Sequence, residues 1–208
     1  MYKRQAAEGR VIVIIDVIDF STTAEAAIEA GALAVLGAAP DKAMPPVAVN
    51  PFGMGVLAGQ LAQEHQTDVI LVSEPRIGKR DSQLATAQHA VQGITSVGAS
   101  IGAVLPNIGA EISKLDNILN RVVLAVTGTG GVAFDAAIKA KAPAVVTATV
   151  ARTRKQKGAM PALTGARRAV ETAKKYQAGI ALVAASGNSM EDILAAKYIY
   201  GLVLERFR

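Results

Sequence analysis

Short runs of β-branched and other apolar residues recur along the chain, and alanine-rich segments with helical spacing separate them. The first run, residues 11–15, carries no polar residue on either face, as expected of a strand covered on both sides in a parallel sheet. Further strands are expected at residues 32–36, 68–72, 122–126, 144–150 and 180–184. Helices are expected at residues 22–30, 54–65, 82–92, 132–141, 165–176 and 189–205. Strands that alternate with helices predict a three-layer α/β/α fold with a largely parallel or mixed central sheet.

Two segments are expected to be long loops or lids. Four of the eight prolines lie within residues 40–51, and residues 93–106 are rich in small side chains. Proline and glycine interrupt regular structure, so neither segment is expected to be regular throughout.

The chain also resembles two related halves of a single domain spanning 1–208, roughly 1–110 and 115–208. Residues 24–36 (AEAAIEAGALAVL) align with residues 134–146 (FDAAIKAKAPAVV), and each copy follows a strand that begins with arginine. The matching positions are Ala26, Ala27, Ile28, Ala30, Ala32, Ala34 and Val35. Chance similarity is the alternative, because alanine is abundant. If the repeat is real, the loops at 16–23 and 127–132 are equivalent and share one site, since ligands bind at the carboxyl ends of parallel strands.

Composition narrows the class of protein. With 208 residues and 51% hydrophobic content, the chain can bury a sizeable core. The absence of cysteine excludes disulfides and thiolate chemistry and suits a reducing compartment, so we expect a cytoplasmic protein. No apolar stretch reaches the roughly 18 to 20 residues of a membrane helix, and the first one is too short for a signal peptide.

The net charge of +5 is concentrated in residues 152–175, where Glu171 is the one acid among eight basic side chains. Such a face could attract nucleic acid, an acidic metabolite or an anionic partner. A solvated helix surface is the simpler interpretation. No aromatic residue accompanies the charges before Tyr176, which disfavours base stacking and hence nucleic-acid binding.

The loop after the first strand combines a carboxylate with hydroxyls. Asp16 ends the strand, and Ser21, Thr22 and Thr23 begin the next helix. A helix N-terminus attracts phosphate, the hydroxyls would add donors, and Asp16 could hold Mg²⁺ against phosphate oxygens. Simple capping of the helix by Ser21 or Thr22 is the alternative.

The loop after the strand at 122–126 is rich in glycine. Four of its residues could hold phosphate oxygens: Thr127, Gly128, Thr129 and Gly130. With Ala133, the two glycines also fit the G-x-G-x-x-A pattern of dinucleotide binding. The acidic residue expected about 20 positions later is missing. Arg152 or Arg154 could instead meet the 2′-phosphate of NADP, which remains an alternative.

Two further strand ends carry polar residues. Glu74 and Arg76 follow the strand at 68–72, where a structural ion pair is an equally good interpretation. Small polar residues at 186–189 follow the strand at 180–184. Four loops of this kind could line one cleft.

Taken in order along the chain, these segments resemble the 2-phosphosulfolactate phosphatase family. Members carry Asp-Val-Leu-Arg-Ala-Ser/Thr-Thr-Thr after the first strand, where this chain has Asp-Val-Ile-Asp-Phe-Ser-Thr-Thr at 16–23. The family's Gly-Glu-Arg is similar to residues 73–76, and its Asn-Ser-Pro-x-Glu has the spacing of Asn107 and Glu111. Its Thr-Asn-Gly-Thr and Ser-x-Glu-Asp segments are similar to residues 127–130 and 189–192.

The resemblance implies Mg²⁺-dependent hydrolysis of a phosphate ester on a sulfonated three-carbon acid, a step towards coenzyme M in methanogens. Asp16 and Glu74 would be the metal ligands, and Glu111 or Asp192 the general acid. Asp16, Glu111 and Asp192 would thus be the catalytic residues. Substrate would be bound by Ser21, Thr22, Thr23, Arg76, Asn107, Thr127, Gly128, Thr129 and Gly130.

The chain departs from the family pattern at three places. Asp19 stands where the family has arginine, Ile108 and Gly109 replace Ser-Pro, and Ala185 or a neighbour replaces a cysteine. A charge change at ~4 Å is worth about 4 kcal/mol at an effective dielectric constant near 20. A doubly anionic phosphosulfonate would bind less well, so the substrate could differ.

The leading hypothesis is therefore a Mg²⁺-dependent phosphatase acting on a small anionic metabolite. A non-catalytic relative that binds such a metabolite or a partner through the same cleft is the second hypothesis, and nucleic-acid binding by residues 152–175 is the third. An exposed apolar helix face would indicate a homodimer.

Overall fold

The computed structural model describes residues 2–18 and 20–207. Asp19, which stands in place of the family arginine, lies outside the described residues. The strands are β1 (Val11–Ile15), β2 (Ala34–Ala38), β3 (Val69–Ser73), β4 (Ile101–Pro106), β5 (Val122–Val126), β6 (Val145–Thr147) and β7 (Ile180–Ala184). The helices are α1 (Tyr2–Ala7), α2 (Phe20–Glu29), α3 (Pro51–Glu64), α4 (Arg80–Leu84), α5 (Gln88–Ser96), the 3₁₀ helix η1 (Gly109–Lys114), α6 (Gly130–Lys139), α7 (Met160–Tyr176) and α8 (Met190–Phe207).

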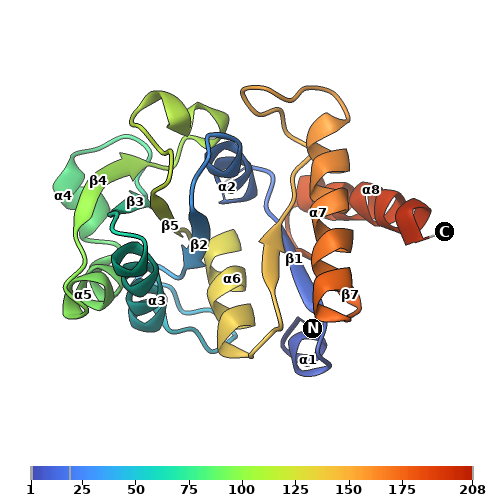
Figure 1. Cartoon of the computed structure of the whole chain (residues 1–208), viewed down its shortest axis with the longest axis horizontal. Helices are drawn as coiled ribbons and strands as arrows, with labels where there is room; N and C mark the ends of the chain where they lie inside the picture. The colour runs from blue at the N-terminus through green and yellow to red at the C-terminus, as the bar shows by residue number, and fades with distance from the viewer. Residues whose placement is uncertain (1, 19, 208) are drawn as a thin grey trace.

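The strands form two all-parallel sheets, in the orders β6-β1-β7 and β2-β5-β3-β4. Helices α7 and α8 pack on the three-stranded sheet, and α3 covers the four-stranded sheet together with α5 (Figure 1). Helices α2 and α6 contact strands of both sheets. The predicted three-layer α/β/α class is confirmed, with the strands divided between two sheets instead of running through one. None of the described helices combines the length and apolar character needed to cross a membrane.

Strand β1 separates the two parts of the core. Ile12 and Ile14 belong to the larger cluster, which contains residues of α2, α6, β3 and β5. Val13 and Ile15 belong to the smaller cluster, which residues of α7 and α8 complete. Both faces of β1 are therefore covered, which explains the absence of polar residues from it.

The two segments aligned in the sequence end their helices with the same pattern of hydrogen bonds. At the end of α2, the amides of Ala30, Gly31 and Ala32 donate to the carbonyls of Ala26, Ile28 and Ala27. The same three bonds recur at the end of α6, where Ala140, Lys141 and Ala142 donate to Ala136, Ile138 and Ala137. Gly31 and Lys141 both have positive φ, at 88° and 59°, as is common just after a helix.

Each copy of the repeat begins in one sheet and ends in the other. The first copy runs from β1 through α2 to β2, and the second from β5 through α6 to β6. Strand β1 pairs with β6, and β5 pairs with β2. The two copies therefore exchange their second strands.

Two parts of the structure differ from the elements expected. Residues 101–106 form strand β4 inside a segment expected to be a long loop or lid. The single helix expected at 82–92 is two helices, α4 and α5, which Thr86 and its neighbours separate.

Candidate functional site

Asp16 lies buried directly after β1, where a tight turn holds its backbone. The Oγ of Ser21 accepts a hydrogen bond from the Asp16 amide at 3.0 Å and donates to the carbonyl of Ile14 at 2.9 Å. Ser21 is fully buried. Its hydroxyl therefore holds the loop before α2, and these are not the bonds of an N-cap, which would accept from an amide of the first helical turn.

The two repeat loops meet at the side chain of Asp16. The hydroxyl of Thr129 donates to Asp16 Oδ2 at 2.5 Å, and the amide of Gly130 donates to the same oxygen at 2.7 Å. A side chain at Gly130 would collide with Phe20 and with Asp16, so glycine permits this close approach. The donors expected to hold phosphate thus hold a carboxylate of the chain itself.

The rest of the glycine-rich loop is also engaged locally. The Oγ1 of the buried Thr127 accepts a hydrogen bond from the Gly131 amide at 2.8 Å. Gly128 has open space around the position that a side chain would take. A dinucleotide pyrophosphate would have to compete with Asp16 and Thr127 for the amides at this helix start, which disfavours the NADP hypothesis.

Asp192, in the first turn of α8, joins the loops that follow β1 and β7. Its Oδ1 accepts from the amide of Val17 at 2.8 Å, and its Oδ2 accepts from the amide of Ser186 at 3.2 Å. Burial raises the pKa of Asp192 above its ordinary value, and the negative charge of Asp16 raises it further. The two hydrogen bonds from backbone amides offset part of this rise. A buried pair of carboxyl groups therefore lies at the carboxyl ends of two neighbouring strands.

Thr22 and Thr23 point into the protein and bind other parts of the chain. Thr22 donates to the carbonyl of Val17, and its Oγ1 lies 3.0 Å from the Oγ1 of Thr149. Thr23 donates to Oδ1 of Asn107 at 2.5 Å. The side-chain Nδ2 of Asn107 is a buried donor that has no hydrogen-bond partner within the described residues.

Arg76 links the loop after β3 to the loop after β1, because its guanidinium donates to the carbonyl of Ile18 at 3.4 Å. Glu74 precedes it, half-buried at the end of β3. These hydrogen bonds thus connect the loops after β1, β3, β5 and β7, the four loops expected to lie together. Within residues 2–18 and 20–207, no group of three or more His, Cys, Asp and Glu residues could hold a metal ion.

Glu111 lies in η1 and forms ion pairs with Lys114 and, at 3.2 Å, with Arg152. The hydrogen bond from Lys114 holds the pKa of Glu111 below its usual value, and Arg152 lowers this pKa further. A carboxyl group that gives up its proton so readily is a poor general acid.

Acidic residues from distant parts of the chain partner much of the basic segment. Arg168 forms an ion pair with the buried Glu25, and Arg152 reaches Glu111. Arg167 and Glu171 lie 3.9 Å apart on the exposed face of α7. The sequence count overstated the basic character of this surface because it left out Glu25 and Glu111, which lie far away in the sequence.

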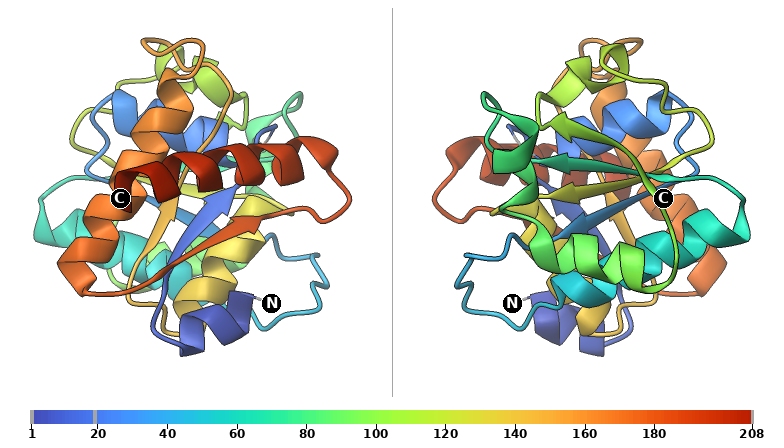
Figure 2. Two further views of the ribbon diagram at one scale, coloured as in Figure 1. Left: turned by 90° about the vertical axis from the view of Figure 1, so that its right-hand side faces the viewer. Right: turned by 90° about the vertical axis from the view of Figure 1, so that its left-hand side faces the viewer.

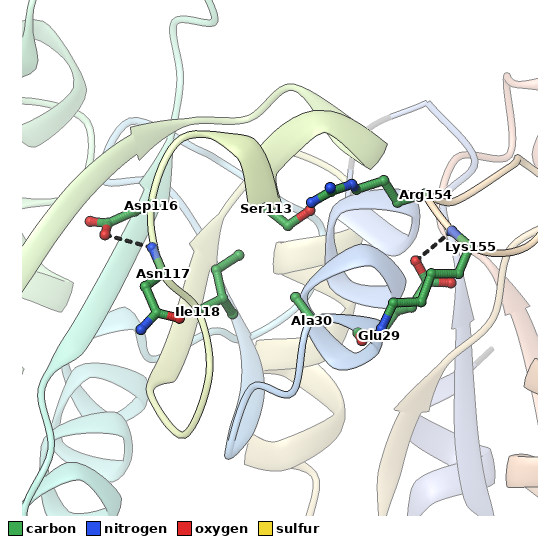
Figure 3. Close-up of a pocket in the computed structure, with 8 residues that line it drawn as sticks. All are labelled: Glu29, Ala30, Ser113, Asp116, Asn117, Ile118, Arg154 and Lys155. Atoms are coloured by element: carbon green, nitrogen blue, oxygen red, sulfur yellow. Dashed lines mark hydrogen bonds between the residues drawn. The ribbon is translucent and has the colours of Figure 1, made fainter.

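A pocket of about 250 Å³ lies away from the strand ends, at the C-terminal end of α2 (Figure 3). It is lined by Glu29, Ala30, Ser113, Asp116, Asn117, Ile118, Arg154 and Lys155. The backbone amide of Lys155 donates to the carboxylate of Glu29 at 2.9 Å, so this carboxylate of the lining is already hydrogen-bonded. Asp16 and Asp192 are not among its lining residues.

Two buried acids, Glu25 and Asp135, escaped the sequence analysis. They occupy the same position in the aligned repeat segments, and this match between two acids was the one available signal. Asp135 accepts hydrogen bonds from the amides of Ala39, at 3.3 Å, and Asn50, at 2.6 Å. Both acids fix the position of elements that surround the site.

No protein-family model matches this chain, and no match is found among curated proteins or among solved structures.

Proposed function

We propose that this protein hydrolyses a phosphate ester of a small anionic metabolite with the help of Mg²⁺, at the carboxyl ends of β1 and β7. The observation that carries the proposal is the buried carboxyl pair of Asp16 and Asp192. Enzymes that need both an acid and a negatively charged group commonly place two carboxyl groups together in different environments. The resemblance to 2-phosphosulfolactate phosphatases supports the same reaction class.

The two carboxyl groups suit different roles. Thr129 and Gly130 stabilise negative charge on Asp16 by donating to it, which suits a ligand for a hard cation. Asp192 has a raised pKa and therefore keeps its proton to a higher pH than an ordinary aspartate. Asp192 would donate that proton to the leaving oxygen of the ester.

The donor set fits Mg²⁺, which needs only one or two protein carboxylates when substrate phosphate and water complete its shell. Asp16 would be one ligand, and Glu74 the second by the resemblance. When bound, Mg²⁺ would neutralise charge on the phosphate and polarise its oxygens. Arg76 would add a positive charge on the loop after β3.

The test is phosphate release from a panel of phosphorylated hydroxy acids that includes 2-phosphosulfolactate, with and without Mg²⁺. Wild type is expected to show metal-dependent turnover, which Asp16→Ala reduces to background. Asp192→Asn is expected to lose about 10²-fold or more in turnover number, the usual contribution of a general acid. The matched change Glu111→Gln should alter turnover only slightly, because Glu111 pairs with Lys114 and Arg152.

Circular dichroism and thermal unfolding of each variant separate loss of chemistry from loss of folding. Absence of phosphate release from every compound, with wild type folded and Mg²⁺ present, would show that the phosphatase proposal is wrong. Equal losses in Asp192→Asn and Glu111→Gln would remove Asp192 from the role of proton donor.

Binding of an anionic metabolite without turnover is the second candidate function. One observation favours it: the buried Nδ2 of Asn107, a residue expected to bind substrate, has no hydrogen-bond partner within the described residues and could donate to an anion. Titration calorimetry with the same panel distinguishes the two functions, because a non-catalytic protein would bind a compound from the panel without releasing phosphate.

A further inference from the structure

Helix α8 exposes large apolar side chains along one face. Among its described residues these are Met190 (62% exposed), Leu194 (56%), Tyr198 (48%), Tyr200 (53%) and Leu204 (44%). The opposite face buries Asp192, Ala195, Ile199 and Val203 against the rest of the protein. An exposed apolar stripe of this kind marks an interaction surface more often than a solvated one.

The position of α8 makes this face accessible. In the left view of Figure 2, α8 crosses the outer surface of the molecule nearest the viewer. In Figure 1 its C-terminal part projects beyond α7 and β7. The exposed face of α8, defined here as Met190, Leu194, Tyr198, Tyr200 and Leu204, can therefore meet a second molecule without hindrance from the rest of the fold.

We propose that the C-terminal part of this exposed face, with Tyr198 and Leu204, binds the same part of a second copy of the chain, with the two α8 helices antiparallel and related by a two-fold axis near Gly201. Gly201 lies on the exposed side of α8, and nothing lies near the position that its side chain would take. A glycine at the centre of the contact lets two helices approach closely. A two-fold axis makes each contact occur twice, which is the usual form of a homodimer interface.

Charge complementarity selects both the partner and the direction. Lys197 and Glu205 are exposed, four residues before and four residues after Gly201. In the antiparallel pair, Lys197 of each copy lies at the level of Glu205 of the other, and Tyr198 lies at the level of Leu204. A parallel pair would instead place lysine beside lysine and glutamate beside glutamate. Within residues 2–18 and 20–207, neither Lys197 nor Glu205 forms an ion pair that would compete.

The expected dimer is weak. A helix of 18 residues is about 27 Å long, so one helix pair buries less area than the roughly 1,200 Å² of a tight interface. The association should therefore depend on protein concentration in the micromolar range. Because Asp192 lies in the first turn of α8, the partner would also restrain the helix that carries it. Association of the two copies does not depend on catalysis, and it is measured by the molecular mass of the protein in solution.

Sedimentation equilibrium of the full chain across the micromolar range measures the association. Wild type is expected to reach the mass of a dimer as concentration rises, and Leu204→Glu is expected to stay monomeric. Met44→Glu is the matched control, because Met44 is 97% exposed in the loop before α3 and lies outside the proposed interface. This control should associate like wild type.

Charge exchange tests the antiparallel arrangement. Lys197→Glu and Glu205→Lys should each weaken the dimer about tenfold, and the double variant should recover the wild-type dissociation constant. Circular dichroism confirms that each variant is folded. A wild type that stays monomeric up to the highest concentration, a dimer that Leu204→Glu leaves intact, or a double variant that fails to recover would each overturn the proposal.

Discussion

Glu25 and Asp135 occupy equivalent positions on α2 and α6, and both carboxyl groups are buried, yet they have different partners. Glu25 accepts hydrogen bonds from the guanidinium of Arg168 and, at 2.6 Å, from the hydroxyl of Thr147. Asp135 accepts only from backbone amides among the bonds described for it. Glu25, in the first copy, binds Thr147 in β6 and Arg168 in α7, which belong to or follow the second strand of the other copy. Asp135, in the second copy, binds Ala39 and Asn50, which follow β2, the second strand of the first copy.

The difference shows how one position of a repeat can keep a buried acid by two physical routes. Arg168 supplies a full positive charge to Glu25, and removing it would leave an uncompensated charge in the protein. Asp135 relies on the partial charges of amides, which only partly offset its burial. Its pKa is consequently raised, with desolvation as the main cause. The first copy should therefore be sensitive to loss of the cation, and the second copy to pH.

The largest effect is expected for Arg168→Ala, which leaves Glu25 buried without its cation. The free energy of unfolding should fall by about 3 to 5 kcal/mol, the usual cost of breaking a buried ion pair from one side. Arg167→Ala is the matched control, because Arg167 is 61% exposed and its partner Glu171 is 67% exposed. The control should change stability by less than about 1 kcal/mol in urea unfolding at neutral pH. Similar losses in the two variants would contradict the role given to Glu25.

A smaller effect is expected for Asp135→Ala. This change removes the acceptor of the Ala39 and Asn50 amides, and an unsatisfied buried donor costs about 1 to 3 kcal/mol. Urea unfolding measures the loss, and Glu171→Ala on the exposed face of α7 serves as the control. A loss that matches or exceeds that of Arg168→Ala would remove the contrast between the two copies.

The smallest effect is the pH dependence that Asp135 contributes. Because its pKa is higher in the folded than in the unfolded protein, the folded state binds the proton first as pH falls. Wild type should therefore gain stability relative to Asp135→Ala as pH falls from above the folded pKa towards the ordinary value, and lose it as pH rises. Unfolding of both proteins across this pH range measures the difference between their free energies of unfolding. The contributions of the other carboxyl groups cancel in this difference, because both proteins share them. A difference that is flat with pH, or that grows as pH rises, would contradict the prediction.

Strands buried on both faces were predictable because they leave a continuous apolar run, as β1, β3 and β5 do. Strand β4 was not, since Gly102 and its small neighbours have the composition of a loop. A Cβ at Gly102 would meet the carboxylate of Asp68 and the guanidinium of Arg121, so the glycine leaves room for this ion pair beside β4. In residues 101–106, glycine therefore reflects the close approach of other side chains to the strand and does not mark irregular structure.

The break between α4 and α5 depends on a residue far away in the sequence. The carboxylate of Asp41 accepts hydrogen bonds from the amides of Gln88, at 2.6 Å, and His89, at 3.1 Å, and so caps the start of α5. A cap normally stands next to its helix and can be recognised there. Here the capping residue comes from the loop after β2, and no local pattern marks it.

The candidate site likewise combines features that local sequence predicts with contacts that it does not. That loops after parallel strands lie together follows from topology, and the sequence predicted it for Asp16 and Thr129. That the Thr129 hydroxyl and the Gly130 amide bind Asp16 follows only from the three-dimensional contact between the copies. Local spacing shows which groups can donate, but it does not show which acceptor reaches them.

The exchange of strands between the copies makes the two halves of the chain interdependent. Strand β1, from the first half, is the middle strand between β6 and β7, and β5, from the second half, lies between β2 and β3. Each half thus supplies one inner strand of a sheet whose other strands come from the other half. The arrangement resembles a domain-swapped pair joined by a linker. Neither sheet can close until both halves have been synthesised. Folding must therefore wait for contacts between residues far apart in the sequence, which favours a slow, concerted assembly over the independent folding of either half.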